Sequence, residues 1–314
     1  MEIKDKKFII TGGAGFLGKH VVSLLINKYK VKEANIFIPR SVEYDLRKEK
    51  DIDILFKKFK PEIVIHLATV SGGLGYYKEH PAKVFHDILS MGTNMLEASR
   101  LSGVKTFIMT GSATIYPAKA EPPYKEEDIW NGLPDESEIS FGLSNRALSS
   151  EILLYRKEYG FDGRFFILSS LYGPGYNFNL THPHVIPSLI KRFDNIISKK
   201  EDKIEIWGTG KALRDFIYVE DAAEAIILAL REYNSSEPLN ISSGEGTSIK
   251  DITERIAKIM KFKGKIVPDL TKPEGRLNRI VSAEKLEKYI KFKGKTDLEN
   301  GLKNTIKDYL NSKK

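Results

Sequence analysis

The sequence predicts an α/β protein with a doubly wound parallel sheet and a second, smaller α/β lobe. Short β-branched runs alternate with amphipathic stretches through the N-terminal half, and a glycine-rich turn joins the first run to the first amphipathic stretch. Alternation of this kind produces right-handed β–α–β crossovers and a sheet covered by helices on both faces. A chain of 314 residues is long enough for one such domain and an added lobe.

Five apolar runs have the length and the β-branched content of buried parallel strands. They are KKFIITGG, ANIFI, EIVIHLA, TFIMTGS and RFFILSS, and helical stretches such as GKHVVSLLINKYK separate them. After Leu171 the pattern loosens into a loop rich in Gly, Pro and His, then a helix in PHVIPSLIKRFDNII and a strand in IEIWG. We therefore expect a larger domain over residues 1–171 and 212–243, and a smaller lobe over residues 172–211 and 244–314.

The composition excludes several kinds of site. The chain has no cysteine, which rules out a disulfide framework, a Cys-ligated zinc and a thiol nucleophile. No His, Asp or Glu spacing indicates another metal site. The net charge of +8 is spread along the chain without interleaved aromatics, so an anionic small ligand is favoured over nucleic acid. With no signal-peptide pattern and no apolar run long enough to cross a bilayer, we expect a cytoplasmic protein without a membrane partner.

Three glycines follow the first predicted strand in TGGAGFLG, at positions 12, 15 and 18. This spacing permits a tight turn, close approach of the backbone to a pyrophosphate, and packing of the helix on the strand. The phosphates would then lie at the positive N-terminus of the first helix. We expect the cofactor to be bound by Gly12, Gly15, Phe16, Leu17 and Gly18. A glycine turn without a ligand is the alternative.

The end of the second predicted strand bears on the choice of cofactor. NAD sites usually place an acidic residue there to bind the ribose 2′-hydroxyl, whereas NADP sites place an arginine near the 2′-phosphate. The strand ends in FIPRS with no acid at its tip, and Arg40 is the cation in this position. The sequence therefore favours NADP, with NAD as the alternative and Arg40 then a surface residue.

Taken together, these motifs resemble the extended short-chain dehydrogenase/reductases, a Rossmann-fold family, and within them the GDP-L-fucose synthases. The resemblance covers nearly the whole chain and rests on GGAGFLG, HLATVSGGLGYY, GSATIYP, LYGPGYNF, PHVIPSLIKRF, IWGTGKALRDFIYVEDAA and TKPEGRLNR. It implies a 4-keto GDP-hexose substrate, which is epimerised next to the ketone and then reduced at C4 by NADPH. It also implies a homodimer formed through the fourth and fifth helices.

The resemblance assigns catalytic positions, and several of them have changed. The family's catalytic serine matches Ser112, but its Tyr-x-x-x-Lys motif is occupied by Phe141 and Asn145. The family's epimerising cysteine falls on Thr114, whereas its epimerising histidine matches His184. Three of these five positions therefore carry a residue that the family's chemistry does not use.

The changed residues alter what the site can do. Phe141 has no proton to donate, and a general acid is typically worth about 10²- to 10⁴-fold in rate. Thr114 is not a carbon base at neutral pH, whereas His184 can be one, since the ordinary histidine pKa is about 6.5. Tyr116 follows in the same loop, which would lean over the nicotinamide, and it is the nearest candidate for a substitute proton donor. A loop tyrosine followed by proline is more often structural, and this is the other role open to Tyr116.

The resemblance also assigns residues to the nucleotide sugar. Arg214 would bind the diphosphate through paired hydrogen bonds, and Arg279 stands where the family has a lysine that contacts the nucleotide. The expected substrate-binding set is Leu171, Val185, Trp207, Arg214 and Arg279. Ser170 replaces a family asparagine, which leaves the identity of the sugar open.

We therefore expect a nucleotide-sugar epimerase/reductase with an altered catalytic centre, acting on a GDP-linked 4-keto hexose. The alternative is a non-catalytic or regulatory protein that binds NADP and a nucleotide sugar. The three changed positions fit natural divergence of an enzyme, binding without turnover, or substitutions engineered to trap a complex.

Overall fold

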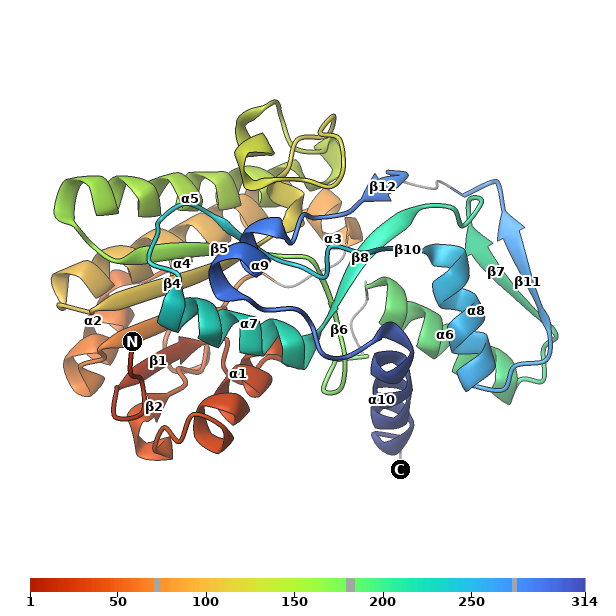
Figure 1. Ribbon diagram of the computed structural model, residues 1–314, viewed down its shortest axis with the longest axis horizontal. Helices are drawn as coiled ribbons and strands as arrows, with labels where there is room; N and C mark the ends of the chain where they lie inside the picture. The colour runs from red at the N-terminus through yellow and green to blue at the C-terminus, as the bar shows by residue number, and fades with distance from the viewer. Residues whose placement is uncertain (71–73, 179–183, 273–275, 314) are drawn as a thin grey trace.

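The computed structural model describes residues 1–70, 74–178, 184–272 and 276–313. Figure 1 shows two unequal parts side by side: a larger one built on a long sheet, and a smaller one that holds the C-terminus. This is the α/β architecture with an added lobe that the sequence predicts.

A six-stranded parallel sheet forms the larger part, in the order β2-β1-β3-β4-β5-β9. Its order reverses direction at β1, which confirms the predicted doubly wound sheet. The strand bounds are β1 Phe8–Thr11, β2 Ile36–Phe37, β3 Ile63–His66, β4 Thr106–Ser112, β5 Gly163–Leu168 and β9 Leu239–Ile241. Strand β2 is shorter than the ANIFI run predicts, because a 3₁₀ turn, η1 (Glu33–Asn35), takes up the first residues of that run.

Helices cover both faces of this sheet (Figure 1). One apolar core joins the sheet to α1 (Phe16–Asn27), α7 (Val219–Glu232) and α9 (Glu284–Ile290). A second core joins the other face to α2 (Glu49–Phe59), α4 (Pro81–Leu101) and α5 (Ile139–Tyr159). Adjacent residues Phe165 and Phe166 of β5 point to opposite cores and are both fully buried. This explains why the strands read as continuous apolar runs.

Short segments connect these elements at the carboxyl edge of the sheet. Helix α3 (Leu74–Glu79) follows β3, and the 3₁₀ turn η2 (Ala113–Ile115) follows β4 directly. Two further 3₁₀ turns, η3 (Glu126–Trp130) and η4 (Glu136–Glu138), lie in the excursion that leads into α5.

The smaller part contains two minor sheets and a third apolar core. One sheet contains β10-β8-β12 with β6 also paired to β8, and the other is the parallel pair β7 and β11. The strand bounds are β6 Ser170–Tyr172, β7 Lys203–Trp207, β8 Leu213–Tyr218, β10 Gly246–Ser248, β11 Lys265–Asp269 and β12 Asn278–Arg279. The helix bounds are α6 Val185–Ser198, α8 Ile249–Ile259 and α10 Leu298–Asn311.

Two elements bear on the expected division of the chain. Strand β8, expected in the larger domain, hydrogen-bonds within a minor sheet, and its neighbour β6 pairs with it. Helix α9, expected in the smaller lobe, packs through Leu286 and Ile290 into the core beside α7. The division into two units remains a prediction, and these elements show that the chain crosses between the two parts more often than the predicted boundaries allow.

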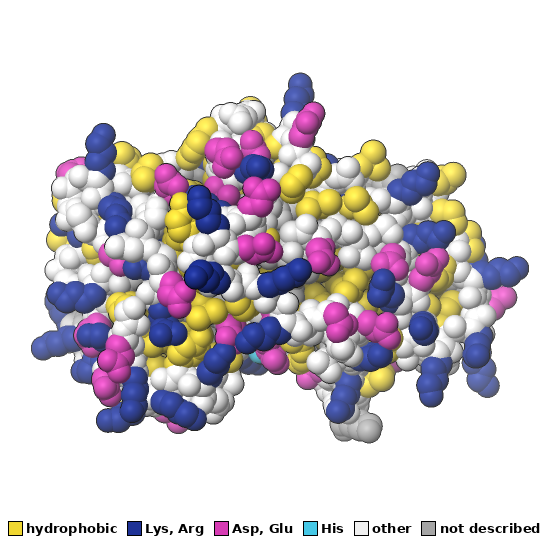
Figure 2. Space-filling model, in the orientation of Figure 1, with side chains coloured by type: hydrophobic (Ala, Val, Ile, Leu, Met, Phe, Trp, Pro, Cys, Tyr) yellow, Lys and Arg dark blue, Asp and Glu magenta, His cyan; other side chains and the backbone are white. Residues whose placement is uncertain are grey.

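Charged side chains are dispersed over the surface. Figure 2 shows Lys and Arg interspersed with Asp and Glu over one face of the molecule. Among the residues described, none of the helices has both the length and the apolar character needed to span a membrane.

Candidate active site

The glycine turn has the geometry that its spacing predicts. Gly12 adopts φ +69°, a left-handed conformation that strains any residue with a Cβ atom. A Cβ atom on Gly18 would overlap the Gly12 carbonyl and come within 2.5 Å of the Gly13 Cα atom. Gly18 thus permits close packing of α1 on the turn. By contrast, a Cβ atom on Gly15 would meet a single atom, the Gly12 carbonyl oxygen at 3.0 Å.

This turn fits a dinucleotide pyrophosphate. Gly15 is the N-cap of α1 and supplies no side-chain hydrogen bond to the first turn. The first N–H groups of a helix have no acceptor within the helix, and the helix dipole makes this end positive. Phe16 and Leu17 begin the helix there, so their N–H groups suit a bound phosphate.

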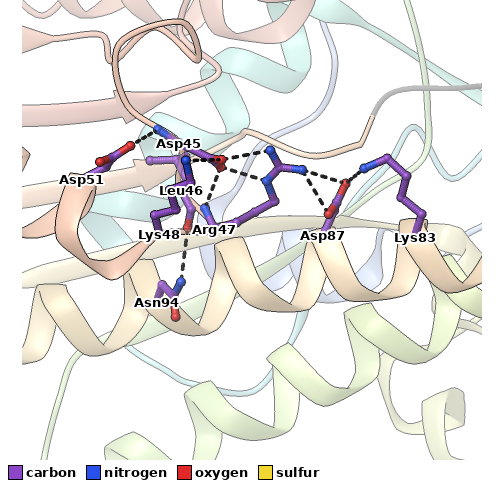
Figure 3. A network of polar contacts seen from close by, with 8 residues as sticks. All are labelled: Asp45, Leu46, Arg47, Lys48, Asp51, Lys83, Asp87 and Asn94. Atoms are coloured by element: carbon purple, nitrogen blue, oxygen red, sulfur yellow. Dashed lines mark hydrogen bonds and ion pairs between the residues drawn. The ribbon is translucent and has the colours of Figure 1, made fainter.

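The segment after β2 is held against α4 by a network of ion pairs (Figure 3). Arg47 donates to both carboxylate oxygens of Asp45, at 2.8 and 2.9 Å, and reaches Asp87 at 3.3 Å. Lys83 completes the network with a 2.6 Å bond to Asp87. The hydrogen bonds from Arg47 lower the pKa of Asp45 to about 2, so this carboxylate is charged and already paired.

Arg40 lies in the same segment and differs from Arg47. Its side chain is exposed, and within the described ranges its guanidinium has no hydrogen bond or ion pair, although its carbonyl accepts bonds from Glu43 and Tyr44. An unpaired cation beside a neutralised acid suits a phosphate better than a ribose hydroxyl.

Four of the expected catalytic positions, at residues 112, 114, 141 and 145, lie where β4 and the start of α5 pack together. Ser112 is the last residue of β4, and its hydroxyl accepts a 3.4 Å hydrogen bond from the Thr114 N–H. Thr114 is buried, and its own hydroxyl has no partner in the part of the chain that the structure describes. Phe141 lies in the first turn of α5, and a Cβ atom on its neighbour Gly142 would come within 2.6 Å of the Thr114 carbonyl oxygen. The start of α5 therefore packs directly on η2.

Asn145 does not extend from its helix as a lysine would. Its amide nitrogen donates a 2.7 Å hydrogen bond to the Phe141 carbonyl, and only 3% of the residue is exposed. A Cβ atom on Gly111 of β4 would overlap the Asn145 Oδ1 atom, so the amide fills the space between α5 and the sheet. The Asn145 side chain is thus a packing group here.

The structure places Tyr116 in the core, which corrects its candidacy as a substitute acid and fits the structural alternative. Its hydroxyl donates a 2.6 Å hydrogen bond to Asn240 of β9, and its ring packs on Tyr124 with centroids 5.2 Å apart. Only 1% of Tyr116 is exposed, and burial raises the pKa of its phenol well above the usual value. Because it is desolvated and already bonded, Tyr116 is a core residue.

A pocket of about 130 Å³ is lined by residues that follow β5 and by segments of the smaller part. Ser112 of β4 pairs in register with Leu168 of β5, and the pocket begins two residues beyond Leu168, at Ser170. Its lining is Ser170, Leu171, His184, Val185, Ile186, Pro187, Arg214, Phe216 and Arg279. Four of the five expected substrate residues, together with His184, therefore share one cavity. The exception is Trp207, which is exposed at the end of β7 and is not part of the lining.

His184 lines the pocket and is the N-cap of α6. Its backbone N–H donates a 3.0 Å hydrogen bond to the Tyr176 hydroxyl, which fixes the start of the helix. The imidazole keeps solvent access, yet the protein around it desolvates it and lowers its pKa below 6.5, with partial opposition from Glu138. A neutral imidazole at neutral pH can accept a proton.

The two pocket arginines are in different states. Arg279 forms a two-bond ion pair with Glu138, at 3.2 and 2.6 Å. Arg214 has no carboxylate partner in the described structure, and donates only to the carbonyls of Leu213 and Arg276. Burial, with the nearby charge of Arg279, lowers the pKa of Arg214 to about 10. A half-buried guanidinium without a counterion is a site for an anion.

Sequence reasoning missed three residues near this site: Glu138, Tyr176 and Tyr77. Glu138 neutralises Arg279, and Tyr176 joins the glycine turn to the pocket, because its ring packs on Phe16 with centroids 5.2 Å apart. The Tyr77 ring packs against Phe141 with centroids 5.1 Å apart. The pair of adjacent tyrosines in GGLGYY is a sequence signal that could have indicated Tyr77. Nothing in the local sequence indicates the contacts of Glu138 and Tyr176.

Comparison with known proteins assigns the class. The profile of the NAD dependent epimerase/dehydratase family matches residues 8–242, and the chain belongs to this family. It is similar over 99% of its length to a GDP-L-fucose synthase of Sinorhizobium fredii, at 30% identity and 97% coverage of that protein. It is also 29% identical to a GDP-L-colitose synthase of Yersinia pseudotuberculosis, over 98% of this chain and 99% of the other.

Solved structures agree with this class. A GDP-L-fucose synthetase from Naegleria fowleri with NADP bound has a TM-score of 0.89 at 27% identity, covering 99% of this chain and 95% of that one. A GDP-mannoheptose C4 reductase from Campylobacter jejuni, also with NADP bound, has a TM-score of 0.88 at 26% identity, covering 98% and 99% of the two chains.

Proposed function

We propose that the protein is an NADP-dependent epimerase/reductase of a 4-keto GDP-hexose, with an altered catalytic centre. The observation that carries the proposal is the pocket lined by both His184 and Arg214, an arginine without a carboxylate partner among the described residues. Four similar proteins named above are called GDP-L-fucose synthase or synthetase, GDP-L-colitose synthase and GDP-mannoheptose C4 reductase, which supports a GDP-sugar as the substrate.

The cofactor would be held by the glycine turn and by Arg40. The N–H groups at the start of α1 would bind the pyrophosphate, and Arg40 would pair with the 2′-phosphate of NADP. When bound, NADPH supplies a hydride to the carbonyl carbon of the substrate. The pairing of Asp45 with Arg47 supports NADP over NAD, because it commits the Asp45 carboxylate to a cation of the protein.

The substrate would be held by the pocket arginines. Arg214 would bind the diphosphate and regain the counterion that it lacks in the protein. Arg279 would contribute less, because Glu138 already balances its charge. Leu171 and Val185 would provide apolar walls for the sugar and the base.

His184 would act on the carbon next to the ketone. A ketone acidifies its neighbouring C–H bonds, so the neutral imidazole of His184 can remove a proton and leave an enolate. A proton returned by His184 restores the original configuration, and inversion takes a proton from water on the opposite face. Ser112 would donate a hydrogen bond to the ketone oxygen and stabilise the charge that develops there. Thr114 has no acid or base capacity at neutral pH, so the epimerising pair is reduced to one side chain.

The test is turnover of GDP-4-keto-6-deoxymannose, followed by the loss of NADPH absorbance, and proton exchange at the neighbouring carbons, followed by NMR in deuterium oxide. We expect both, and we expect the His184→Gln variant to lose exchange while it retains NADPH binding. A thermal shift with GDP that exceeds the shift with UDP would support the nucleotide. Equal shifts would contradict it.

A second candidate function is binding of NADP and a nucleotide sugar without turnover. The loss of the phenol at Phe141 and the inward position of Asn145 favour it. Binding of both ligands with neither NADPH consumption nor deuterium exchange would establish this alternative.

We also propose a homodimer formed through α4 and α5. Large apolar side chains are exposed on these two helices, at Phe85, Leu101, Leu153, Leu154 and Tyr159. Light scattering should give twice the monomer mass of 35.6 kDa. Charged substitutions at Leu153 and Leu154 should give a monomer, and an unchanged dimer would contradict this face.

A further inference from the structure

We propose that Tyr77 donates the proton that Phe141 cannot. The inference rests on the proposed function and concerns its reduction step. It assigns the role of general acid to a phenol on α3. The family resemblance places that acid on α5, at the position of Phe141.

The first argument is the contact between the two rings. The centroids of Tyr77 and Phe141 are 5.1 Å apart and the planes are tilted by 34°. Phe141 keeps the aromatic ring of the family's phenol but lacks the hydroxyl. Tyr77 places the ring of a phenol against the ring that occupies the family's acid position.

The second argument is the position of α3. Strand β3 ends at His66, which pairs with Met109 of β4, so the residues that follow emerge at the carboxyl edge of the sheet. In an open α/β sheet this edge binds the ligand. Helix α3 then packs against η4, the turn directly before α5. Tyr77 is half-buried there and belongs to the apolar cluster that includes Phe141 and Ala113.

The third argument concerns the ring contacts of the nearby tyrosines. The Tyr116 ring packs on Tyr124, and the Tyr176 ring packs on Phe16. In the position next to Tyr77, the Tyr76 ring packs on His80 with centroids 4.8 Å apart. Among the described residues, Tyr77 is the tyrosine whose ring packs on Phe141.

The step balances with the proposed reductant. When bound, NADPH would supply a hydride to the carbonyl carbon, the C=O π bond would break, and its electron pair would go to oxygen. The O–H bond of Tyr77 breaks, and its proton forms the new O–H bond of the alcohol. NADP⁺ and the Tyr77 phenolate remain, and the phenolate then takes a proton from water.

The direct experiment compares Tyr77→Phe with the matched control Tyr76→Phe. We expect Tyr77→Phe to lower kcat for reduction by about 10²- to 10⁴-fold, the usual worth of a general acid. The dissociation constant of NADPH should stay unchanged. The control should retain the wild-type rate. A Tyr77→Phe enzyme as fast as the control would overturn the proposal.

A rescue separates catalysis from structure. Adding Phe141→Tyr to the Tyr77→Phe variant should restore most of the lost rate, because it returns a phenol to the neighbouring ring. A purely structural effect of Tyr77→Phe would not be reversed by this second change. If NADPH still binds but the rate is not restored, a phenol at residue 141 cannot replace the phenol of Tyr77, and this would count against the proposal.

A readout without turnover completes the test. The positive nicotinamide of NADP⁺ should lower the pKa of a phenol beside it. Titration of tyrosinate absorbance with and without NADP⁺ should show one shifted phenol, which disappears in Tyr77→Phe and persists in Tyr76→Phe. If the shift persists in Tyr77→Phe, the placement of Tyr77 is wrong. If the shift behaves as expected and the wild type consumes no NADPH, the proposed reaction fails while the placement of the phenol is supported.

Discussion

The side-chain amide of Asn145 donates a 2.7 Å hydrogen bond to the backbone carbonyl of Phe141, one helical turn earlier. The family resemblance expects a phenol at residue 141 and an amine at residue 145. Here a hydrogen bond within α5 links these two positions. The amide also fills the space in front of Gly111 on β4. These residues form a packed surface at the catalytic edge, and the chemistry has to come from groups around it.

Restoring both family residues should raise the reduction rate. In the double variant Phe141→Tyr/Asn145→Lys, the new phenol supplies a second general acid. The lysine side chain does not fit the space next to Gly111 that the Asn145 amide fills, so it has to turn toward the cofactor. We expect a gain of up to about 10²-fold in kcat, below the full worth of a general acid because Tyr77 already donates. The rate of NADPH oxidation measures it, with Asn145→Lys alone as the control. No gain would mean that the active-site geometry has moved.

Two alanine substitutions in the glycine turn should have different effects. Gly18→Ala forces a methyl group onto the Gly12 carbonyl, so it should cost about 1–3 kcal/mol of unfolding free energy and also weaken NADP binding. Gly15→Ala meets only one atom, at 3.0 Å, and should leave stability nearly unchanged while it weakens NADP binding at least tenfold. Calorimetry and thermal unfolding measure the two quantities. Equal NADP affinity in Gly15→Ala and the wild type would contradict the phosphate site.

Removing the unpaired pocket charge should weaken binding of the nucleotide. A hydrogen bond to a charged group is worth about 1.5–3 kcal/mol, so Arg214→Gln should weaken GDP binding about 10- to 100-fold. Arg255→Gln is the matched control, because Arg255 pairs with Asp251 on α8, away from the pocket lining. Titration calorimetry compares the two variants. The hypothesis fails if both bind GDP equally well.

The buried histidine of β3 should make stability depend on pH. The Thr11 hydroxyl accepts the Ala68 N–H and lies 2.8 Å from the His66 Nδ1 atom, so its proton is directed at a neutral imidazole. Burial lowers the pKa of His66 from 6.5 to about 4. Between these values the unfolded chain binds a proton that the folded chain does not, so stability falls as the pH drops from 6.5 toward 4, by roughly 3 kcal/mol in all.

Denaturant unfolding at several pH values tests this dependence. The slope of stability against pH should flatten over this range in His66→Gln, whatever its absolute stability. A slope that the substitution leaves unaltered would assign the acid sensitivity to other groups. His184 has the same direction of shift, so His184→Gln should flatten the slope by a smaller amount.

Tyr116 should matter for stability and not for chemistry. Tyr116→Phe removes the hydroxyl and leaves the buried Asn240 oxygen without its donor, which costs about 1–3 kcal/mol. The rate of NADPH oxidation at a temperature where the variant is folded should match the wild type. A large loss of rate at full folding would return Tyr116 to the list of catalytic candidates.

The amino-acid sequence alone determined the class of the fold and the position of the cofactor turn. Runs such as IVIH are buried on both faces of a sheet, and glycines at 12, 15 and 18 occupy positions where a turn and close packing exclude other residues. Both signals arise from constraints on neighbouring residues, so they can be read locally. The grouping of Leu171, His184, Val185, Arg214 and Arg279 also followed from the family resemblance, and the structure places them in one pocket.

Only the tertiary structure decided which side chains are available for chemistry. Tyr116 is bonded to Asn240, 124 positions away, and Arg279 is neutralised by Glu138, 141 positions away. Tyr77 meets Phe141 because α3 and the start of α5 come together at one edge of the sheet. The state of a proton donor or a cation depends on its burial and its partner, and those partners come from segments that only folding brings into contact.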